Sequence, residues 1–189
     1  LVTVSSSGQT CVDLPLAAGW NLLALPVQPG SSDPAAVLTP IAGKYTLAFA
    51  YNGCDTADPW KRYDPAAPPP ANDLTAIDLT RGVWVQMNTA ATATFCGSPP
   101  PATTPINLCT GWNLAGYPST LTAAPAQAFS TIAGCYTLAF GYKASDAADP
   151  WKRYDPAAPP PANDLTQLTP GSGLWISTSK ACTWTVAGK

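Results

Sequence analysis

Three aspartates recur at the same spacing in two parts of the chain and are the first candidates for chemistry. The first set is Asp58, Asp64 and Asp73, and the second set is Asp149, Asp155 and Asp164. Two carboxylates beside aromatic rings are the machinery of glycosidases. The chain, however, contains no histidine, and all 11 acidic residues are aspartate. Because few side chains then have a pKa that a fold can tune to neutral pH, and a serine nucleophile would lack its usual base, we expect no catalytic residues.

The aspartates lie within an 18-residue segment, DPWKRYDPAAPPPANDLT, that occupies residues 58–75 and is repeated letter for letter at 149–166. A binding interpretation takes Trp60, Tyr63, Trp84 and Asp73 as a platform for sugar rings, since aromatic faces and carboxylates suit carbohydrates. The possible ligand-facing aromatics are Trp60, Tyr63, Trp151 and Tyr154.

A structural interpretation of the same segment is favoured. Asp-Pro steps predict turns, because aspartate accepts backbone hydrogen bonds and proline presets φ. Lys61 and Arg62 are expected to pair with Asp58 and Asp64 or to lie over a tryptophan face. The proline run then crosses the domain in an extended form and turns back at 72–73 before a new strand begins. On this interpretation the segment is a clasp that closes a small domain.

Composition excludes several classes of partner. The formal net charge is −2, and charged residues make up 11% of the chain. A nucleic-acid-binding protein needs a basic stripe, and a polybasic membrane contact needs a basic cluster, so neither is expected. No run of 18 apolar residues predicts a membrane span. No basic-then-apolar leader opens the chain, which suits a mature secreted form.

Six cysteines without a histidine indicate disulfides rather than zinc. No pair has the C-x-x-C spacing that zinc sites usually use. The aspartate-rich stretches CDTADP and SDAADP lack the spacing of a known calcium loop. We therefore expect no metal and no cofactor, and an oxidising, extracellular location.

The repeat extends over almost the whole chain and divides it into domains. GWNLLALPV and GWNLAGYPS match, as do YTLAFAYNG and YTLAFGYKA. We expect an N-terminal arm at 1–10, a first domain at 11–97, a proline-rich linker at 98–105 and a second domain at 106–189.

Each copy has the pattern of short strands. In YTLAFAY, Tyr45, Leu47, Phe49 and Tyr51 alternate with small residues, so one face of the strand is large and the other small. Only DPAAVLTPIAG and its counterpart APAQAFSTIAG suit one or two helical turns. The expected fold is all-β, with two tandem small β-sandwich or barrel-like domains, long proline-rich loops and cores rich in aromatic residues.

Antiparallel pairing of the first and last strands of each domain predicts two disulfides. Cys11 and Cys96 sit in those strands of copy one, and Cys109 and Cys182 in those of copy two. The sum of two paired residue numbers is constant along an antiparallel ladder, and both pairs fit one ladder to within one residue. We therefore predict Cys11–Cys96 and Cys109–Cys182.

The two remaining cysteines, Cys54 and Cys135, occupy non-equivalent places in the two copies. They can bridge the domains, bridge neighbouring molecules or remain free. Unpaired thiols are unusual outside the cell, which favours bridging.

The set GWNL, YTLAFAY, DPWKRYDP, NDLT and GVWV or GLWI resembles a module that recurs in tandem in secreted and cell-surface proteins of thermophilic bacteria and archaea. The resemblance covers nearly the whole chain, twice. It implies a surface location and a non-catalytic role, and it brings no ligand or catalytic residues with it. The six cysteines and the near-perfect second copy depart from that module.

Self-association is the function that these features favour. The arm has no counterpart in copy two, and its apolar residues are Leu1, Val2 and Val4. Copy two has the proline spacer where copy one has a strand. A domain short of a strand accepts one from a neighbour in pilus-like assemblies, so residues 1–8 are a candidate donated strand. The alternatives are a frayed terminus and, for the whole chain, a monomeric carbohydrate-binding or adhesive module.

Overall fold

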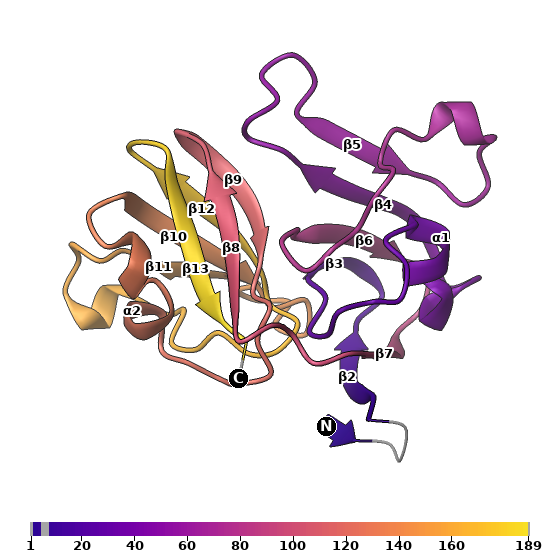
Figure 1. Ribbon diagram of the computed structural model, residues 1–189, viewed down its shortest axis with the longest axis horizontal. Coiled ribbons are helices and arrows are strands. Elements are labelled where there is room, and N and C mark those ends of the chain that lie inside the picture. The colour runs from indigo at the N-terminus through magenta and orange to yellow at the C-terminus, as the bar shows by residue number, and fades with distance from the viewer. Residues whose placement is uncertain (1, 5–7, 189) are drawn as a thin grey trace.

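The protein consists of two β-sandwich domains, domain 1 from the first half of the chain and domain 2 from the second (Figure 1). The computed structural model describes residues 2–4 and 8–188, so the predicted arm residue Leu1 lies outside the described residues. Each domain combines a four-stranded antiparallel sheet with a smaller sheet, and neither pair of sheets forms a closed barrel. The predicted all-β fold is confirmed, in its sandwich form.

Domain 1 has a smaller sheet of order β1-β2-β7 and a larger sheet of order β3-β6-β4-β5. Its strands are β1 (Val2–Val4), β2 (Thr10–Leu16), β3 (Gly19–Leu23), β4 (Tyr45–Tyr51), β5 (Trp60–Tyr63), β6 (Val83–Met87) and β7 (Ala91–Gly97). Its helical turns are α1 (Pro34–Val37), η1 (Thr39–Ile41) and η2 (Pro69–Ala71). The helical content is therefore limited to single turns, as expected.

Domain 2 repeats this plan with a two-stranded sheet, β13-β8, and a four-stranded sheet, β11-β10-β12-β9. Its strands are β8 (Thr103–Leu108), β9 (Gly111–Gly116), β10 (Tyr136–Tyr142), β11 (Trp151–Tyr154), β12 (Gly173–Thr178) and β13 (Cys182–Ala187). Its helical turns are α2 (Pro125–Ala128), η3 (Ser130–Ile132) and η4 (Pro160–Ala162).

The linker predicted at 98–105 is three residues too long. Strand β8 begins at Thr103, so domain 2 does have the first strand that the sequence was expected to lack. The proline-rich composition misled the prediction because Pro105 lies within this strand. Proline is tolerated in an edge strand, where its missing N–H faces away from the ladder.

The motif GWN holds the turn between the first two strands of each sandwich. Asn21 accepts a hydrogen bond from the N–H of Ala17 at 2.9 Å and donates one to the carbonyl of Ala17 at 2.8 Å. Gly19 has a φ of 89°, a conformation that side chains disfavour. The same bonds recur in domain 2 around Asn113.

The cores are less aromatic than predicted. Along β4 the small residues Ala48 and Ala50 face the core, and their large neighbours Phe49 and Tyr51 face outward. The core of domain 1 is mainly aliphatic, whereas that of domain 2 contains the fully buried Trp184. Most tryptophans therefore lie outside the cores.

The structure confirms the predicted Cys11–Cys96 disulfide and corrects the second. In domain 1, Cys11 lies directly opposite Cys96 on strands β2 and β7. In domain 2, however, Cys182 lies opposite Leu108, one residue away from Cys109. A shift of one residue in a strand turns the side chain to the other face, so Cys109 and Cys182 cannot bond.

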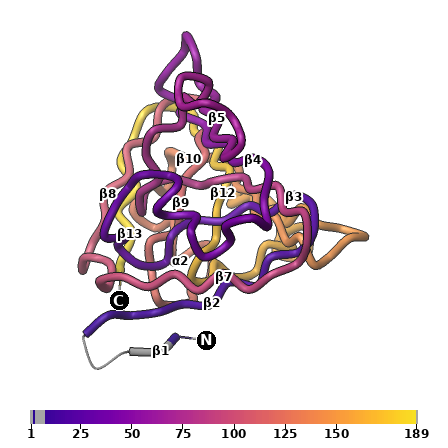
Figure 2. Tube along the Cα trace, turned by 90° about the vertical axis from the view of Figure 1, so that its right-hand side faces the viewer, coloured from indigo at the N-terminus to yellow at the C-terminus, as the bar shows by residue number. Residues whose placement is uncertain are grey.

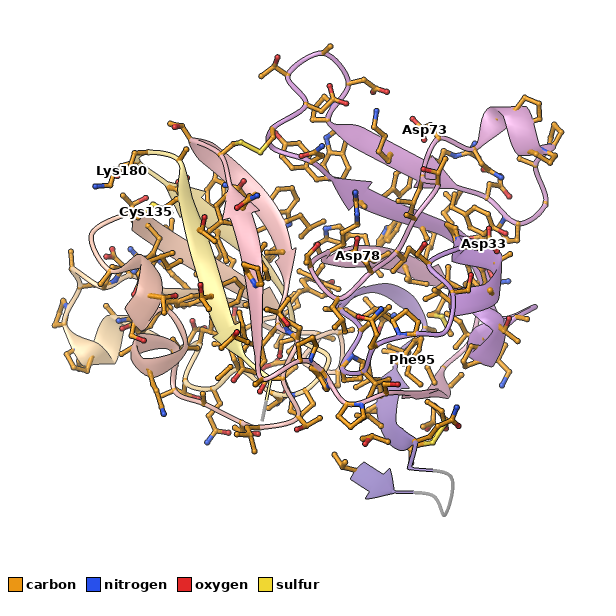
Figure 3. All side chains as sticks on the ribbon, in the orientation of Figure 1. Asp33, Asp73, Asp78, Phe95, Cys135 and Lys180 are labelled. Carbon is orange, nitrogen blue, oxygen red and sulfur yellow. A yellow bond between two sulfur atoms is a disulfide. The ribbon has the colours of Figure 1, made fainter. Side chains whose placement is uncertain are left out.

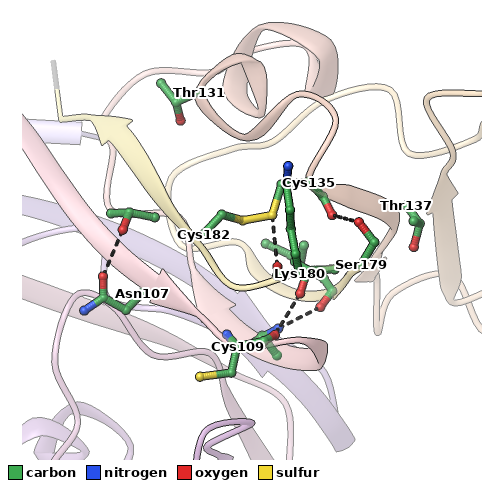
Figure 4. The surroundings of a disulfide bond; sticks show 12 residues. Asn107, Cys109, Thr131, Cys135, Thr137, Ser179, Lys180 and Cys182 are labelled. Atoms are coloured by element: carbon green, nitrogen blue, oxygen red, sulfur yellow. Dashed lines mark hydrogen bonds between the residues drawn. A yellow bond between two sulfur atoms is a disulfide. The ribbon is translucent and has the colours of Figure 1, made fainter.

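Cys182 instead bonds to Cys135 within domain 2, and Cys109 bonds to Cys54 across the domains. The sulfur of Cys109 points away from the Cys135–Cys182 bond (Figure 4). Of the alternatives for Cys54 and Cys135, Cys54 bridges the domains, and Cys135 joins the turn before β10 to strand β13 of its own domain. No cysteine in the described chain is free.

Backbone contacts also join the domains, in two equivalent sets. The N–H of Ala24 donates to the carbonyl of Gly171, and the N–H of Gly116 donates to the carbonyl of Thr80, both at 2.9 Å. A Cβ at Gly173 would lie 2.7 Å from the carbonyl oxygen of Leu23, so only glycine permits this approach. With the Cys54–Cys109 disulfide, these bonds hold the two sandwiches in a fixed arrangement; Figure 3 draws the side chains on both.

The pseudo-two-fold arrangement predicts a second site for an inter-domain disulfide. Ala17 and Ser145 are the equivalents of Cys109 and Cys54, and both line one cavity between the domains. We expect Ala17→Cys with Ser145→Cys to form a disulfide and to raise stability by about 2–4 kcal/mol. Mass spectrometry of digested protein without reductant detects the bond, and denaturant unfolding measures its effect. Ala18→Cys with Ser145→Cys is the control and should remain reduced, because Ala18 is an exposed bend residue that does not line this cavity.

Candidate functional site

Aromatic side chains line the outward face of both four-stranded sheets. In domain 1 this aromatic row consists of Trp20 on β3, Phe49 and Tyr51 on β4, Trp60 on β5 and Trp84 on β6. The equivalent row in domain 2 consists of Trp112, Phe140, Tyr142, Trp151 and Trp175. Because strand side chains alternate between faces, the residues between these rings fill the core.

The two rows meet where the domains meet. The ring of Tyr51 lies 5.1 Å from that of Trp175 in the other domain, and the ring of Tyr142 lies 4.9 Å from that of Trp84. Trp60 also reaches Trp175, at 5.8 Å between ring centroids. Each domain thus places two rings against a tryptophan of the other domain: Tyr51 and Trp60 contact Trp175, and Tyr142 and Trp151 contact Trp84.

Trp151 makes the corresponding contact from domain 2, because its ring lies 5.6 Å from that of Trp84. Its interplanar angle of 64° equals that of the Trp60–Trp175 pair. Edge-to-face contacts at these distances are favourable beyond the area they bury. The repeated segment therefore supplies one of the rings that join the domains.

A groove opens along the row of domain 1 at this boundary. Its volume is about 500 Å³. It is lined by Trp20, Phe49, Trp60, Trp84, Tyr142 and Trp151. We call this the aromatic groove. Trp60 is 46% exposed and Trp20 is 38% exposed, so its walls are open to solvent.

A matching ring set lies on domain 2. Trp112 stands 6.3 Å from Trp175 at 86°, as Trp20 stands 6.3 Å from Trp84 at 87°. The matching ring set comprises Trp112, Phe140, Trp151, Trp175, Tyr51 and Trp60. Trp112 is 41% exposed. The same arrangement of rings is therefore presented twice.

The tryptophans of the aromatic groove differ from the core tryptophan in their hydrogen bonds. Of the tryptophans, Trp184 in the core donates its indole N–H to the carbonyl of Ala128 at 2.8 Å. Within residues 2–4 and 8–188, no side chain or carbonyl accepts a hydrogen bond from the indole N–H of Trp20, Trp60 or Trp84. The groove thus combines aromatic faces with unpaired donors.

Ion pairs within the repeated segment hold Trp60 in place. The Nζ of Lys61 lies 2.8 Å from Asp58 and 3.2 Å from Asp55, and the guanidinium of Arg62 lies 2.6 Å from Asp64. The expected pairing of these two cations with aspartates is thus observed. The N–H of Asp58, and then Lys61, stabilise the charged form of Asp55 and lower its pKa.

Hydrogen bonds close the proline-rich loop on itself. Asn72 accepts from the N–H of Asp64 at 2.8 Å and donates to its carbonyl at 3.0 Å. The carboxylate of Asp73 accepts from the N–H of Arg62, whose carbonyl accepts from the N–H of Leu74. Leu74 is buried and anchors the returning chain, although the expected new strand does not form there. The clasp therefore has a physical basis.

The second copy of the segment repeats these bonds. Asn163 accepts from the N–H of Asp155 at 2.7 Å and donates to its carbonyl at 3.0 Å. Asp164 accepts from the N–H of Arg153. Because most of these bonds lie inside the segment, the same sequence folds in the same way in both domains.

The repeated aspartates have structural partners. Asp58 is an exposed partner of Lys61, Asp64 pairs with Arg62, and Asp73 binds a backbone N–H. In the second copy, Asp149 and Asp164 lie 2.9 and 3.8 Å from the ammonium of Lys152. No group of three or more metal-ligating side chains occurs in the described part of the chain. These carboxylates are therefore engaged in ion pairs and backbone hydrogen bonds.

The structure separates the four predicted ligand-facing aromatics into two pairs. Trp60 and Trp151 line the aromatic groove. Tyr63 and Tyr154 instead pack against the cores. The hydroxyl of Tyr45 contacts that of Tyr63, and burial is the main reason that the pKa of Tyr45 is raised. Trp60 and Tyr63 are three residues apart in one strand, so period-two alternation already placed them on opposite faces.

The prediction also missed residues that line the groove. Trp20, Phe49 and Tyr142 were not among the ligand-facing candidates, and they come from strands outside the repeated segment. Alternation of Phe49 and Tyr51 with alanine was the available signal, because a face with large residues belongs either to a core or to a binding surface. The contribution of Tyr142 from the other domain had no sequence signal.

The hydrogen bonds of the clasp predict a matched pair of stability effects. Asn72→Ala leaves the N–H and carbonyl of Asp64 without their partner, so it should lower the free energy of unfolding by about 1–2 kcal/mol. Asn163→Ala should cost a similar amount, because its geometry is the same. Urea unfolding followed by tryptophan fluorescence measures both. Asp58→Ala, at an exposed ion pair, is the control with little effect, and unchanged stability in both asparagine variants would contradict the clasp.

The shifted pKa values of four side chains predict the pH range over which the fold is stable. The pKa values of Asp55 and Asp146 lie below the usual 3.8. Their contribution to the stability of the fold is therefore present above that pH and is lost as pH falls through the lowered pKa values. The pKa of Lys61 and Lys152 is raised above 10.5, so their contribution is lost only above that pH. With no histidine, thermal unfolding should be flat between about pH 5 and 9 and fall below about pH 4. A midpoint that changes steeply near pH 6.5 would contradict this.

No protein-family model, curated protein or solved structure matches the chain. The functional argument therefore rests on the molecule's own geometry. Two features stand out in that geometry: the paired aromatic sets at the domain boundary, and the edges of the two smaller sheets.

Proposed function

We propose that the chain is an extracellular structural subunit that assembles with copies of itself into a filament or surface array. In this assembly, strand β1 of one copy adds to the edge of β8 in the next. One observation carries the proposal, a difference between two otherwise equivalent sheet edges. The edge of β2 holds β1, whereas β8 has β13 as its one strand partner in the described parts of the chain.

The two edges are equivalent residue by residue. In domain 1, Cys11 pairs with Cys96, and in domain 2 the residues in the same places, Thr103 and Ala187, pair with each other. The register is therefore shared along both ladders. A strand that pairs with the edge of β2 therefore meets backbone groups at the equivalent register positions on β8.

Backbone groups on β8 are oriented to accept a strand. Proline has no N–H, so Pro105 suits a ladder position whose backbone groups point away from β13. Thr103, two residues before Pro105, shares this orientation, whereas Asn107 lines a cavity between β8 and Gly53 of domain 1. The N–H and carbonyl of Thr103 therefore point outward from the edge, and such groups are a template for another strand. The residue equivalent to Thr103 is Cys11, which lies opposite Thr3 of β1.

The arm itself is weakly held in its own chain. Strand β1 lies at the periphery of domain 1 (Figure 2) and pairs through three residues, with Val2 opposite Val12 and Val4 opposite Thr10. Val2 is 46% exposed. So short a strand opens at little cost, which supports exchange between its own β2 and a neighbour's β8. Of the predicted donated strand 1–8, residues 5–7 lie outside the described chain.

Such a contact leads to open assembly. The donor strand belongs to domain 1 and the acceptor edge to domain 2, so the contact is head-to-tail. A head-to-tail contact that does not close on itself produces a filament. β-Strand addition also supplies main-chain hydrogen bonds without requiring a deep pocket.

The disulfides support an extracellular setting for this role. All three form between well-separated parts of the chain. Disulfides of this kind persist in oxidising compartments. Each helix in the described part of the chain is a single turn, and none is long and apolar enough to cross a bilayer.

Removing the donor strand or blocking the acceptor edge tests the proposal. The full chain should form multimers visible by negative-stain electron microscopy and light scattering. A variant lacking residues 1–8 and the Thr103→Pro variant should both remain monomeric, since one loses the strand and the other loses an outward N–H. Thr103→Ala, which keeps that N–H, is the matched control and should assemble. Fibres formed by the truncated chain would refute the role of the arm.

A further inference from the structure

We infer that the aromatic groove and the matching ring set are two equivalent binding sites for neutral sugar rings, which make the molecule a bivalent glycan binder. This inference goes beyond self-assembly, because the sites lie on the four-stranded sheets and the assembly edges lie on the smaller sheets. Three properties of the groove carry it: its size, its lack of charge and its unpaired donors.

The size of the groove suits a small ligand rather than a protein surface. A volume of about 500 Å³ falls within the range of small-molecule sites, about 300–1,000 Å³. The groove also lies between two domains, where such sites are frequent. Its walls come from both domains, with Trp84 on one side and Tyr142 and Trp151 on the other. The inter-domain bonds therefore hold the site in its binding shape.

The charge of the groove points to a neutral ligand. All six lining residues are aromatic, and none carries a formal charge. A phosphate, sulfate or uronate would lose its hydration without finding a cation there. The neighbouring Arg62 and Lys61 are already paired with aspartates. Neutral hexose units are the chemical class that fits.

The rings present both kinds of contact that a sugar needs. Trp20 meets Trp84 at 87°, and Phe49 meets Trp60 at 88°, so the rings stand as perpendicular walls. The negative face of an aromatic ring attracts the C–H groups on the apolar face of a pyranose. The unpaired indole N–H groups, together with the hydroxyl of Tyr142, donate to sugar hydroxyls.

Two sites on one rigid body have a functional consequence. Trp20 belongs to the first site and Trp112 to the second, whereas Trp60 and Trp151 contribute to both. A polysaccharide that engages both sites gains avidity without any new contact. Copies of the chain would also be cross-linked by a shared glycan.

Titration with neutral oligosaccharides tests the inference. Fragments of β-glucan, mannan and chitin are added to the full chain and followed by isothermal calorimetry and tryptophan fluorescence. At least one should bind with two sites per chain. Trp20→Ala and Trp112→Ala should each leave one site, and the double variant should lose at least about tenfold in affinity or all binding, because each substitution removes one aromatic wall of a site.

Matched controls separate this result from loss of folding and from self-assembly. Leu121→Ala removes an equally exposed apolar side chain outside the groove and should bind as the wild type does. The variant lacking residues 1–8 should also bind unchanged, so failure of the proposed assembly and failure of glycan binding are distinguishable. Circular dichroism confirms that the tryptophan variants remain folded.

Three results would overturn the inference. The first is that no neutral oligosaccharide binds, and the second is that binding survives the double tryptophan variant. The third is that sulfated or uronic oligosaccharides bind more tightly than neutral ones. Binding of a peptide with the sequence AAPPPAND in place of a sugar would instead identify the groove as a site for the exposed prolines of a second copy.

Discussion

The exchange of aromatic rings between the two domains is the interaction on which the rest of the structure depends. Trp60 contacts the partner domain from one side, and Trp151 does so from the other. A contact with this symmetry requires the same surface on both partners. The residues that build that surface are accordingly the same in both copies. The cores, which contact only their own domain, have diverged, and the buried Trp184 of domain 2 occupies the place of the buried Ala93 in domain 1.

Small differences between the domains make the two ends of the molecule unlike each other. One inter-domain disulfide, Cys54–Cys109, occurs where perfect symmetry would place two. Only the edge of β2 holds a third strand among the described residues, and in the proposed assembly the edge of β8 accepts one from a neighbour. The two domains are thus unlike at their sheet edges and alike at the aromatic surface. A head-to-tail contact of the proposed kind would use the unlike edges and leave the two ring sets unchanged.

The few charged side chains of the repeated segment pair with residues that are close to them in sequence. The ion pairs and side-chain hydrogen bonds of the repeated segment connect residues that are close in sequence, such as Lys61 with Asp58 and Asn72 with Asp64. These bonds stiffen the loop that carries Trp60, so the ring is held at the surface without a charged neighbour in the aromatic groove. A rigid aromatic wall loses little conformational entropy when a ligand binds.

The sequence by itself determined the two tandem β domains, the short helical turns and the Cys11–Cys96 bond, because repeats and strand periodicity can be read from the order of residues, but it left sandwich and barrel open. It did not determine which cysteine Cys109 bonds, because a one-residue offset in register reverses a side chain. Nor did it show that Phe49 and Tyr51 face outward. Alternation establishes only that they lie opposite Ala48 and Ala50. Which of the two faces becomes core, and which becomes a groove shared with the other domain, was decided by packing in three dimensions.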